Sequence, residues 1–175
     1  GREVEGRVVG ILGYGRLGEI FSRFAKGFAM QVIACDPFKK ITDDWVEQVD
    51  FEELLARAEI ITIHVHLTDE TRNMINRDVF NKMRAGVYLV NTSRGGLIDE
   101  EAFIEALGSG KIMCAGIDVL ANELDGDIIN EPLVKYAKSH SNLIISPHIG
   151  GCSYDAQEKS YKHTATKLIN ALKEL

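Results

Sequence analysis

The feature that most limits the possible folds is a regular alternation between short apolar runs and longer amphipathic stretches. Runs of four to six mostly aliphatic residues lie at 7–12, 31–35, 60–64, 87–91, 114–118 and 143–146. Such runs suit strands that are buried on both faces, as in a parallel sheet covered by helices. Apolar residues recur at helical spacing in 16–28, 51–58, 76–83, 100–107, 133–138 and 154–175. Six strands with helical crossovers predict a doubly wound α/β sheet in a single three-layer domain.

The composition excludes several other classes of protein. The 175 residues include 20 Lys+Arg and 26 Asp+Glu, a formal net charge of −6, which argues against a nucleic-acid interface. No apolar run reaches the roughly 18 residues of a membrane span, and the first residues lack the apolar stretch of a signal peptide. Cys35, Cys114 and Cys152 are widely spaced and form no C-x-x-C pair. We therefore expect reduced thiols, no metal site, no nucleic-acid or membrane partner, and a cytoplasmic location.

A glycine-rich turn, G-x-G-x-x-G, follows the first predicted strand directly and opens the first predicted helix. In this context Gly13 permits a tight turn, Gly15 lets the backbone approach a pyrophosphate, and Gly18 allows close helix packing. The N–H groups of Arg16 and Leu17 would then face the phosphates. The motif predicts a Rossmann-type nucleotide-binding fold, with a turn that binds no ligand as the alternative.

An acidic residue follows the second predicted strand, where a dinucleotide-binding chain needs one. Asp36 lies 18 residues after Gly18, and its carboxylate could accept hydrogen bonds from both ribose hydroxyls of an adenosine. It would repel the 2′-phosphate of NADP, because a like-charge contact costs several kcal/mol. Lys39 and Lys40 are close enough in the sequence to weaken this discrimination. The sequence therefore favours NAD and leaves NADP open.

Polar side chains follow the last three predicted strands. Arg94 follows the fourth strand, Asp118 and Glu123 close the fifth, and His148 closes the sixth. The carboxyl ends of parallel strands form the edge at which ligands bind in open α/β sheets. Each residue alone has an ordinary explanation as a surface, cap or core residue. Together they indicate a site that combines an arginine, two carboxylates and a histidine.

Four segments carry a resemblance to a known family: Gly-Tyr-Gly-Arg-Leu-Gly at 13–18, His-Val-His-Leu-Thr-Asp-Glu-Thr-Arg at 64–72, Asn-Thr-Ser-Arg-Gly-Gly at 91–96 and Pro-His-Ile-Gly-Gly at 147–151. With them the chain resembles the nucleotide-binding domain of the D-isomer-specific 2-hydroxyacid dehydrogenases, a family that includes D-3-phosphoglycerate dehydrogenase. The likeness runs over nearly the whole chain. It implies an NAD-dependent oxidoreductase that transfers a hydride between NAD(H) and C2 of a small D-2-hydroxy or 2-oxo acid.

The resemblance also implies residue roles. Arg94 matches the arginine that binds the substrate carboxylate, His148 matches the acid–base group, and Glu123 matches the acid paired with that histidine. These three are the implied catalytic residues. The implied cofactor-binding residues are Gly13, Gly15, Arg16, Leu17, Gly18, Asp36, His64, Thr68, Thr92, Asp118 and Gly150. Among them, Asp118 would bond the nicotinamide carboxamide with help from the Thr92 main chain, and the loop with His64 and Thr68 would flank the adenosine.

The chain departs from the family pattern in four places. His66 and Leu124 stand where the family usually has proline, and an acidic Gly-Asp insertion lies between Glu123 and His148. Family members also carry a substrate-binding domain, which residues 1–175 lack. We therefore expect the chain to bind NAD and to turn over substrate poorly by itself.

Two further expectations concern partners and alternatives. Relatives commonly dimerise through this domain, so a homodimer is expected, with Phe103 and Ile104 as candidate contacts unless they face the sheet. An NAD(H)-sensing corepressor-like module of the same fold is the main alternative to an enzyme, although no extra partner-binding segment is visible. A neighbouring class of NAD-dependent amino-acid dehydrogenase fits less well, because Arg94, Glu123 and His148 match the hydroxyacid pattern jointly.

Overall fold

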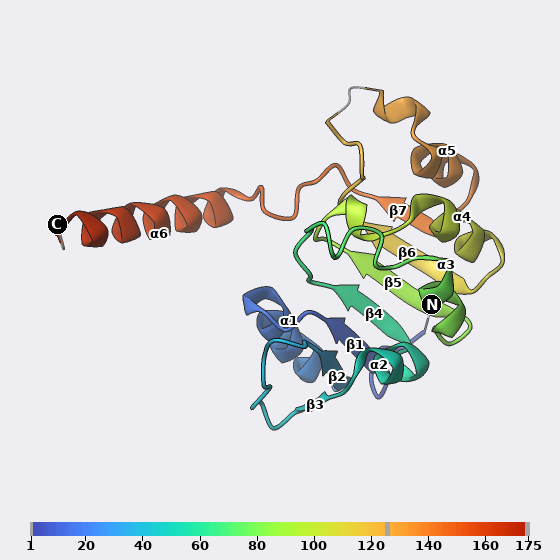
Figure 1. The fold of residues 1–175 in the computed structure, drawn as a ribbon, viewed down its shortest axis with the longest axis horizontal. Helices are drawn as coiled ribbons and strands as arrows, with labels where there is room; N and C mark the ends of the chain where they lie inside the picture. The colour runs from blue at the N-terminus through green and yellow to red at the C-terminus, as the bar shows by residue number, and fades with distance from the viewer. Residues whose placement is uncertain (1, 125–126, 174–175) are drawn as a thin grey trace.

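A parallel sheet of seven strands forms the centre of the molecule (Figure 1), in a computed structural model that describes residues 2–124 and 127–173. The strands are β1 (Val8–Leu12), β2 (Gln31–Cys35), β3 (Val46–Gln48), β4 (Ile60–Ile63), β5 (Val87–Asn91), β6 (Ile112–Ile117) and β7 (Leu143–Ile145). Their order across the sheet is β3-β2-β1-β4-β5-β6-β7, and every neighbouring pair is parallel. The order reverses between β1 and β4, as in doubly wound Rossmann-type sheets, so the predicted fold class is confirmed.

Helices cover the two faces of the sheet unequally. The helices are α1 (Arg16–Gly27), α2 (Phe51–Arg57), α3 (Arg77–Lys82), α4 (Glu100–Gly108), α5 (Pro132–Ser139) and α6 (Tyr154–Lys173), with short 3-10 turns η1 (Gly95–Leu97) and η2 (Ile128–Asn130). Along β1, Val9 and Ile11 belong to a buried cluster under α1, whereas Leu12 belongs to a larger cluster shared with α2 to α5. This alternation follows the two-residue period of a strand and places the sheet between two helical layers.

Two sequence-based expectations about packing are corrected. Phe103 is fully buried and stacks on Phe80 with ring centroids 5.8 Å apart, while Ile104 packs against the same core. Both residues lie on the face of α4 that packs against the core, so they are not dimer contacts. The third strand in sequence, β3, was missed because its three residues, Val-Glu-Gln, bury only Val46 at the sheet edge. It makes the sheet seven-stranded and brings the chain from the end of β2 back alongside it.

The starts of the helices differ in a way that matters for the site. Side chains of Asp50, Asn76 and Asp99 accept hydrogen bonds from the first turns of α2, α3 and α4. Helix α1 instead has Gly15 at its N-cap position, where no side chain caps the helix. The first N–H groups of a helix have no partner within the helix. Among these four helices, α1 is therefore the one whose first N–H groups can donate hydrogen bonds to a bound group.

The last helix does not join the body of the domain. Figure 1 shows α6 extending away from the sheet, and its side chains are almost entirely exposed. The predicted helix is present, and positions 174 and 175 at its end lie outside the described residues. Within the described part of the chain, no helix combines the length and apolarity required to cross a membrane.

Candidate functional site

The glycine-rich turn connects β1 to α1 and brings three chain segments into close contact. Gly13 has φ of +89°, and its N–H donates to the Cys35 carbonyl at 2.9 Å. A Cβ on Gly18 would lie 2.4 Å from the carbonyl oxygen of Gly13, so α1 approaches the turn as closely as only glycine permits. Both glycines therefore serve the turn's geometry, as the motif predicts.

The third glycine faces open space. A Cβ on Gly15 would meet no atom within 4 Å, and Gly15 lines a cavity beside the turn. Arg16 and Leu17 follow as the first residues of α1. Their N–H groups and the helix dipole provide the donors and the partial positive charge that a phosphate group needs.

Asp36 lies at the end of β2, on the rim of the same cavity. One carboxylate oxygen accepts from the N–H of Tyr14 at 2.9 Å, and the other accepts from the N–H of Phe38 at 2.9 Å. The side chain is thereby fixed between the glycine-rich turn and the following loop. Each oxygen keeps a further lone pair that can accept a hydroxyl.

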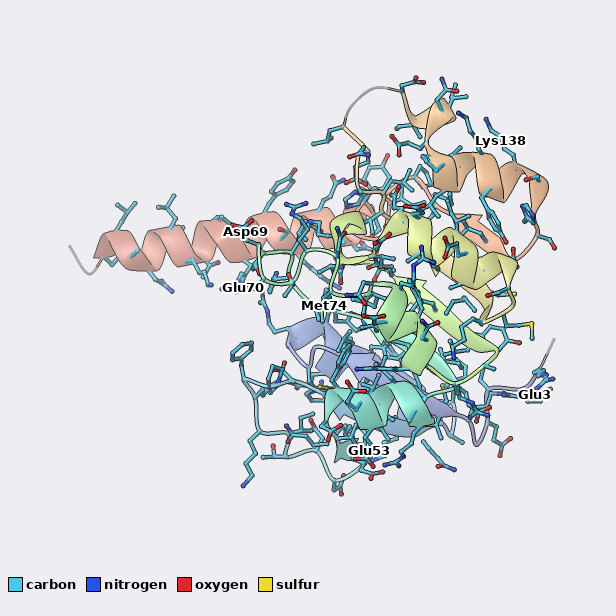
Figure 2. The ribbon with its side chains drawn as sticks, turned by 45° about the vertical axis from the view of Figure 1, so that its right-hand side comes forward. Glu3, Glu53, Asp69, Glu70, Met74 and Lys138 are labelled. Atoms are coloured by element: carbon cyan, nitrogen blue, oxygen red, sulfur yellow. The ribbon has the colours of Figure 1, made fainter. Side chains whose placement is uncertain are left out.

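The cavity has a volume of about 800 Å³ and lies across the carboxyl ends of β1, β2 and β4. The order of strands reverses here, which is where open α/β sheets bind ligands. Its far wall is the loop after β4, on which Figure 2 labels Asp69, Glu70 and Met74. Its lining includes Gly13, Gly15, Cys35, Asp36, Phe38, Val49, His64, His66, Thr68, Glu70 and Met74.

His64 is a partly buried polar residue of this cavity wall. Its Nε2 lies 3.0 Å from Thr62 Oγ1, and burial lowers the pKa of His64 below its usual value. Its buried Nδ1 has no hydrogen-bond partner among the described residues. Thr68 fixes the loop that follows, because its N–H donates to Thr71 Oγ1 at 2.8 Å. His66 is exposed at the cavity, and its carbonyl accepts from Thr71 Oγ1 at 2.7 Å.

The residues after β5 form a short hydrogen-bonded turn. Asn91 is buried, donates to the Arg94 carbonyl at 2.9 Å and accepts from the Ser93 N–H at 3.0 Å. Thr92 and Arg94 are both exposed on this turn. Arg94 donates one N–H to the Ser93 carbonyl at 2.6 Å, and its other guanidinium N–H groups have no partner among the described residues. The turn thus presents a free cation at the edge of the sheet.

Asp118 follows β6 and holds the loop after β7. Its Oδ1 accepts from Ser146 Oγ at 2.5 Å and from the Ile149 N–H at 3.0 Å, while Oδ2 accepts from the Gly150 N–H at 2.8 Å. Burial by itself raises the pKa of Asp118, but these hydrogen bonds and the nearby His148 hold it below the usual aspartate value. Asp118 is therefore a carboxylate that binds the Ser146 side chain before His148 and the backbone of Ile149 and Gly150 after it.

Glu123 and His148 form a side-chain pair next to that anchor. Glu123 Oε1 lies 2.8 Å from His148 Nδ1, and Glu123 Oε2 accepts from the Leu120 N–H at 3.3 Å. His148 has φ of +53°, an uncommon conformation for a residue with a side chain. The pair therefore leaves Nε2 as the ring atom that can exchange a proton with a ligand.

A second cavity of about 570 Å³ lies beside this pair. Leu120, Val134 and Ile145 form its walls, and Lys138, labelled in Figure 2, lies at its margin on α5. The predicted Gly-Asp insertion begins at position 126, and positions 125 and 126 lie outside the described residues.

The structure sorts the predicted site residues into groups. The larger cavity is lined by Gly13, Gly15, Asp36, His64 and Thr68, and Gly18 lies behind the turn. Direct hydrogen bonds or a shared loop join Asp118, Glu123, His148 and Gly150. Thr92 and Arg94 share the turn after β5 and touch neither group through a side-chain hydrogen bond among the described residues.

Sequence reasoning missed two supporting residues, Asn91 and Ser146. Asn91 opens the motif at 91–96 and Ser146 ends the apolar run at 143–146, so a polar side chain at a strand end was the available signal.

The larger cavity fits a dinucleotide on structural grounds. Open space at Gly15, a carboxylate at Asp36 with spare lone pairs, and the unpartnered His64 Nδ1 are arranged around one cavity. The helix start supplies donors for phosphates, and Asp36 supplies acceptors for ribose hydroxyls.

Comparison with known proteins gives a consistent picture. Residues 1–150 match the family model described as the NAD binding domain of D-isomer specific 2-hydroxyacid dehydrogenase. The chain is 42% identical over 172 residues to a hydroxypyruvate reductase of Thermotoga maritima, covering 98% of this chain and 55% of that protein. It is 35% identical over 175 residues to a D-3-phosphoglycerate dehydrogenase of Mycobacterium leprae, covering 98% of this chain and 32% of that protein.

A solved structure agrees. The NAD-complexed D-isomer specific 2-hydroxyacid dehydrogenase of Lactobacillus delbrueckii ssp. bulgaricus superposes with a TM-score of 0.92 at 27% identity, covering 99% of this chain and 55% of that one. The chain thus spans about half the length, or less, of the relatives it matches.

Proposed function

Because the chain belongs to the D-isomer-specific 2-hydroxyacid dehydrogenases and forms their NAD-binding domain, we propose that it is the NAD-binding half of an enzyme that interconverts a small D-2-hydroxy acid and its 2-oxo acid. The observation that carries the proposal is the 2.8 Å hydrogen bond between Glu123 and His148, on a loop that Asp118 anchors. A histidine held in this way at a nucleotide-binding sheet edge suits proton transfer coupled to hydride transfer.

Arg94 binds the substrate carboxylate in this proposal. Its guanidinium offers a planar pair of N–H donors that matches a carboxylate, and the turn fixed by Asn91 sets its position. NAD(H), when bound, supplies or accepts the hydride at C2 of the substrate.

His148 handles the proton. In reduction its Nε2 donates a proton to the oxygen on C2, and in oxidation it takes the hydroxyl proton. Glu123 is a positioning residue, because its carboxylate contacts Nδ1 and fixes the orientation of the ring. Asp118 holds the left-handed backbone at His148, and its remaining lone pair can accept from the nicotinamide carboxamide with the Thr92 main chain nearby.

The cofactor assignment rests on the larger cavity. The turn at Gly13, Gly15 and Gly18 and the N–H groups of Arg16 and Leu17 hold the pyrophosphate, and Asp36 binds the adenosine ribose. His64 and Thr68 line the adenosine end of the cavity, and Gly150 keeps the histidine loop close to Asp118.

Calorimetric titration with NADH tests the cofactor site. We expect the chain to bind NADH, and Asp36→Ala to weaken binding at least tenfold, because two charge-assisted hydrogen bonds are lost. Asp155→Ala is the matched control, since Asp155 lies on the exposed helix α6. Equal binding by the wild-type chain and Asp36→Ala would contradict the assignment.

The chemistry is tested on the whole protein that contains this chain, by following NADH oxidation with glyoxylate and hydroxypyruvate as 2-oxo acids. Arg94→Gln should raise the KM for the 2-oxo acid, because the bidentate contact is lost. His148→Asn should lower kcat by about 10²-fold or more with NADH affinity unchanged. Full activity in His148→Asn would remove the proposed role.

The proposal extends to the surroundings of the domain. A second domain of the whole protein covers the substrate, so the isolated chain binds NADH with little turnover. The protein is cytoplasmic and forms a homodimer. The exposed apolar face of α1 supports the dimer, because Leu17, Phe24 and Phe28 are 63–65% exposed and point away from the sheet. An NAD(H)-sensing corepressor-like module is less favoured, since the Glu123–His148 pair has no use in simple binding.

A further inference from the structure

A lysine that follows Asp36 closely in the sequence is held by a carboxylate on α1. Lys39 follows Asp36 by three residues. Its Nζ lies 3.3 Å from Glu19 Oε2 on α1 and 5.0 Å from the centroid of the Tyr14 ring. The same loop contributes Asp36, Pro37 and Phe38 to the lining of the larger cavity, and that lining does not extend to Lys39 among the described residues.

The backbone of the loop is fixed in the arrangement that allows this contact. Gln48 Nε2 donates to the Lys39 carbonyl at 2.8 Å, and Gln48 Oε1 accepts from the Ile41 N–H at 2.9 Å. Further along, Asp43 accepts from the Tyr14 hydroxyl at 2.8 Å. The loop is thereby tied to β3 and to the glycine-rich turn, and the Lys39 side chain contacts the first turn of α1.

The position of this cation matters for the choice between NAD and NADP. A 2′-phosphate would lie on the ribose beside Asp36, where a nearby lysine would offset the repulsion by the carboxylate. Lys39 is the first cationic side chain after Asp36. A carboxylate that holds Lys39 away from the ribose therefore strengthens the discrimination against NADP.

We propose that Glu19 is a specificity-determining residue that favours NAD over NADP by holding Lys39 against α1, away from the ribose edge. This inference rests on the proposed binding of NAD at the glycine-rich turn. Glu19 is not among the described residues that line the cavity, and its side chain contacts Lys39, so it acts through Lys39.

The test is a calorimetric titration of the chain with NADH and with NADPH, which gives the ratio of Kd for NADPH to Kd for NADH. Glu19→Gln should lower this ratio about fivefold, the size of a surface ion pair worth about 1 kcal/mol. Removing Glu19 also removes a negative charge near the phosphates, so the double variant Glu19→Gln/Lys39→Gln separates the two effects. In the double variant the ratio should return to the wild-type value or above.

Arg23→Gln is the matched control. Arg23 pairs with the other oxygen of Glu19 at 2.5 Å, one turn along the same helix, so its removal leaves the Glu19–Lys39 contact in place. The ratio should be unchanged, and thermal unfolding should show all variants folded.

Two results would overturn the inference: an unchanged ratio in Glu19→Gln, or an equal fall in the double variant, which would assign the effect to the charge of Glu19 itself. A wild-type chain that binds neither nucleotide would instead refute the proposed cofactor site, and the inference with it.

Discussion

Gly18 provides the sharpest test of how closely α1 approaches the glycine-rich turn. In Gly18→Ala the new Cβ would lie 2.4 Å from the Gly13 carbonyl oxygen and 3.2 Å from Ile11 Cγ2. The first distance is about 1 Å shorter than an ordinary van der Waals contact. Because the carbonyl and the Cβ are both fixed to the backbone, no side-chain rotation relieves the clash, and the helix or the turn must move.

The expected magnitude follows from two opposing effects. Overpacking costs about 1–3 kcal/mol, and a clash with backbone belongs at the upper end. Alanine in place of glycine stabilises a helix by about 1 kcal/mol. Gly18→Ala should therefore lower the free energy of unfolding by about 2 kcal/mol and the Tm by about 4–8 °C for a chain of this size.

Gly27→Ala is the matched control on the same helix. A Cβ there would meet nothing within 4 Å, and the residue is exposed near the helix end. It should be neutral or stabilising by up to about 1 kcal/mol. The two variants are compared by urea unfolding, with equal m-values as the check that the unfolded states are alike. If Gly18→Ala proves as stable as Gly27→Ala, the close approach of α1 to the turn is wrong.

Three further predictions concern buried groups. Burial, together with a hydrogen bond to Asp43, raises the pKa of Tyr14 to about 12, so one of the five tyrosines should ionise near that pH in an absorbance titration, and Tyr14→Phe should abolish this step. Burial lowers the pKa of His64 below 6.5, so the unfolded state takes up the proton first on acidification. The free energy of unfolding should therefore fall as the pH drops below about 6.5, and His64→Gln should reduce this slope in urea titrations. Leu54 is fully buried under the sheet, and Leu54→Ala should cost about 3 kcal/mol of unfolding free energy in the same assay; a loss below about 1 kcal/mol would show that the site is not tightly packed.

The sequence predicted the strands that are strongly apolar and the turn that is strongly glycine-rich. It did not predict β3, because Val-Glu-Gln at a sheet edge buries one side chain and carries no periodic signal. It also predicted a helix at 100–107 but left open whether Phe103 faces the sheet or a partner, which only the packing of α4 on α3 and β6 resolved. Helix α1 shows the same limit of sequence-based prediction. Its apolar residues recur at helical spacing, yet the small residues Gly18, Ser22 and Ala25 are the ones that are buried against the sheet.

Residue order alone determined that Arg94, Asp118, Glu123 and His148 would follow parallel strands, because the carboxyl ends of such strands share one edge. The tertiary structure decided what each can do there. Asp118 accepts three hydrogen bonds from the loop that carries His148. Glu123 contacts Nδ1 of His148, which lies 25 residues further along the chain. Lys39, which the sequence placed beside Asp36, is turned toward Glu19. Local sequence sets which groups are available at the sheet edge, whereas contacts between distant segments decide their orientation and their partners.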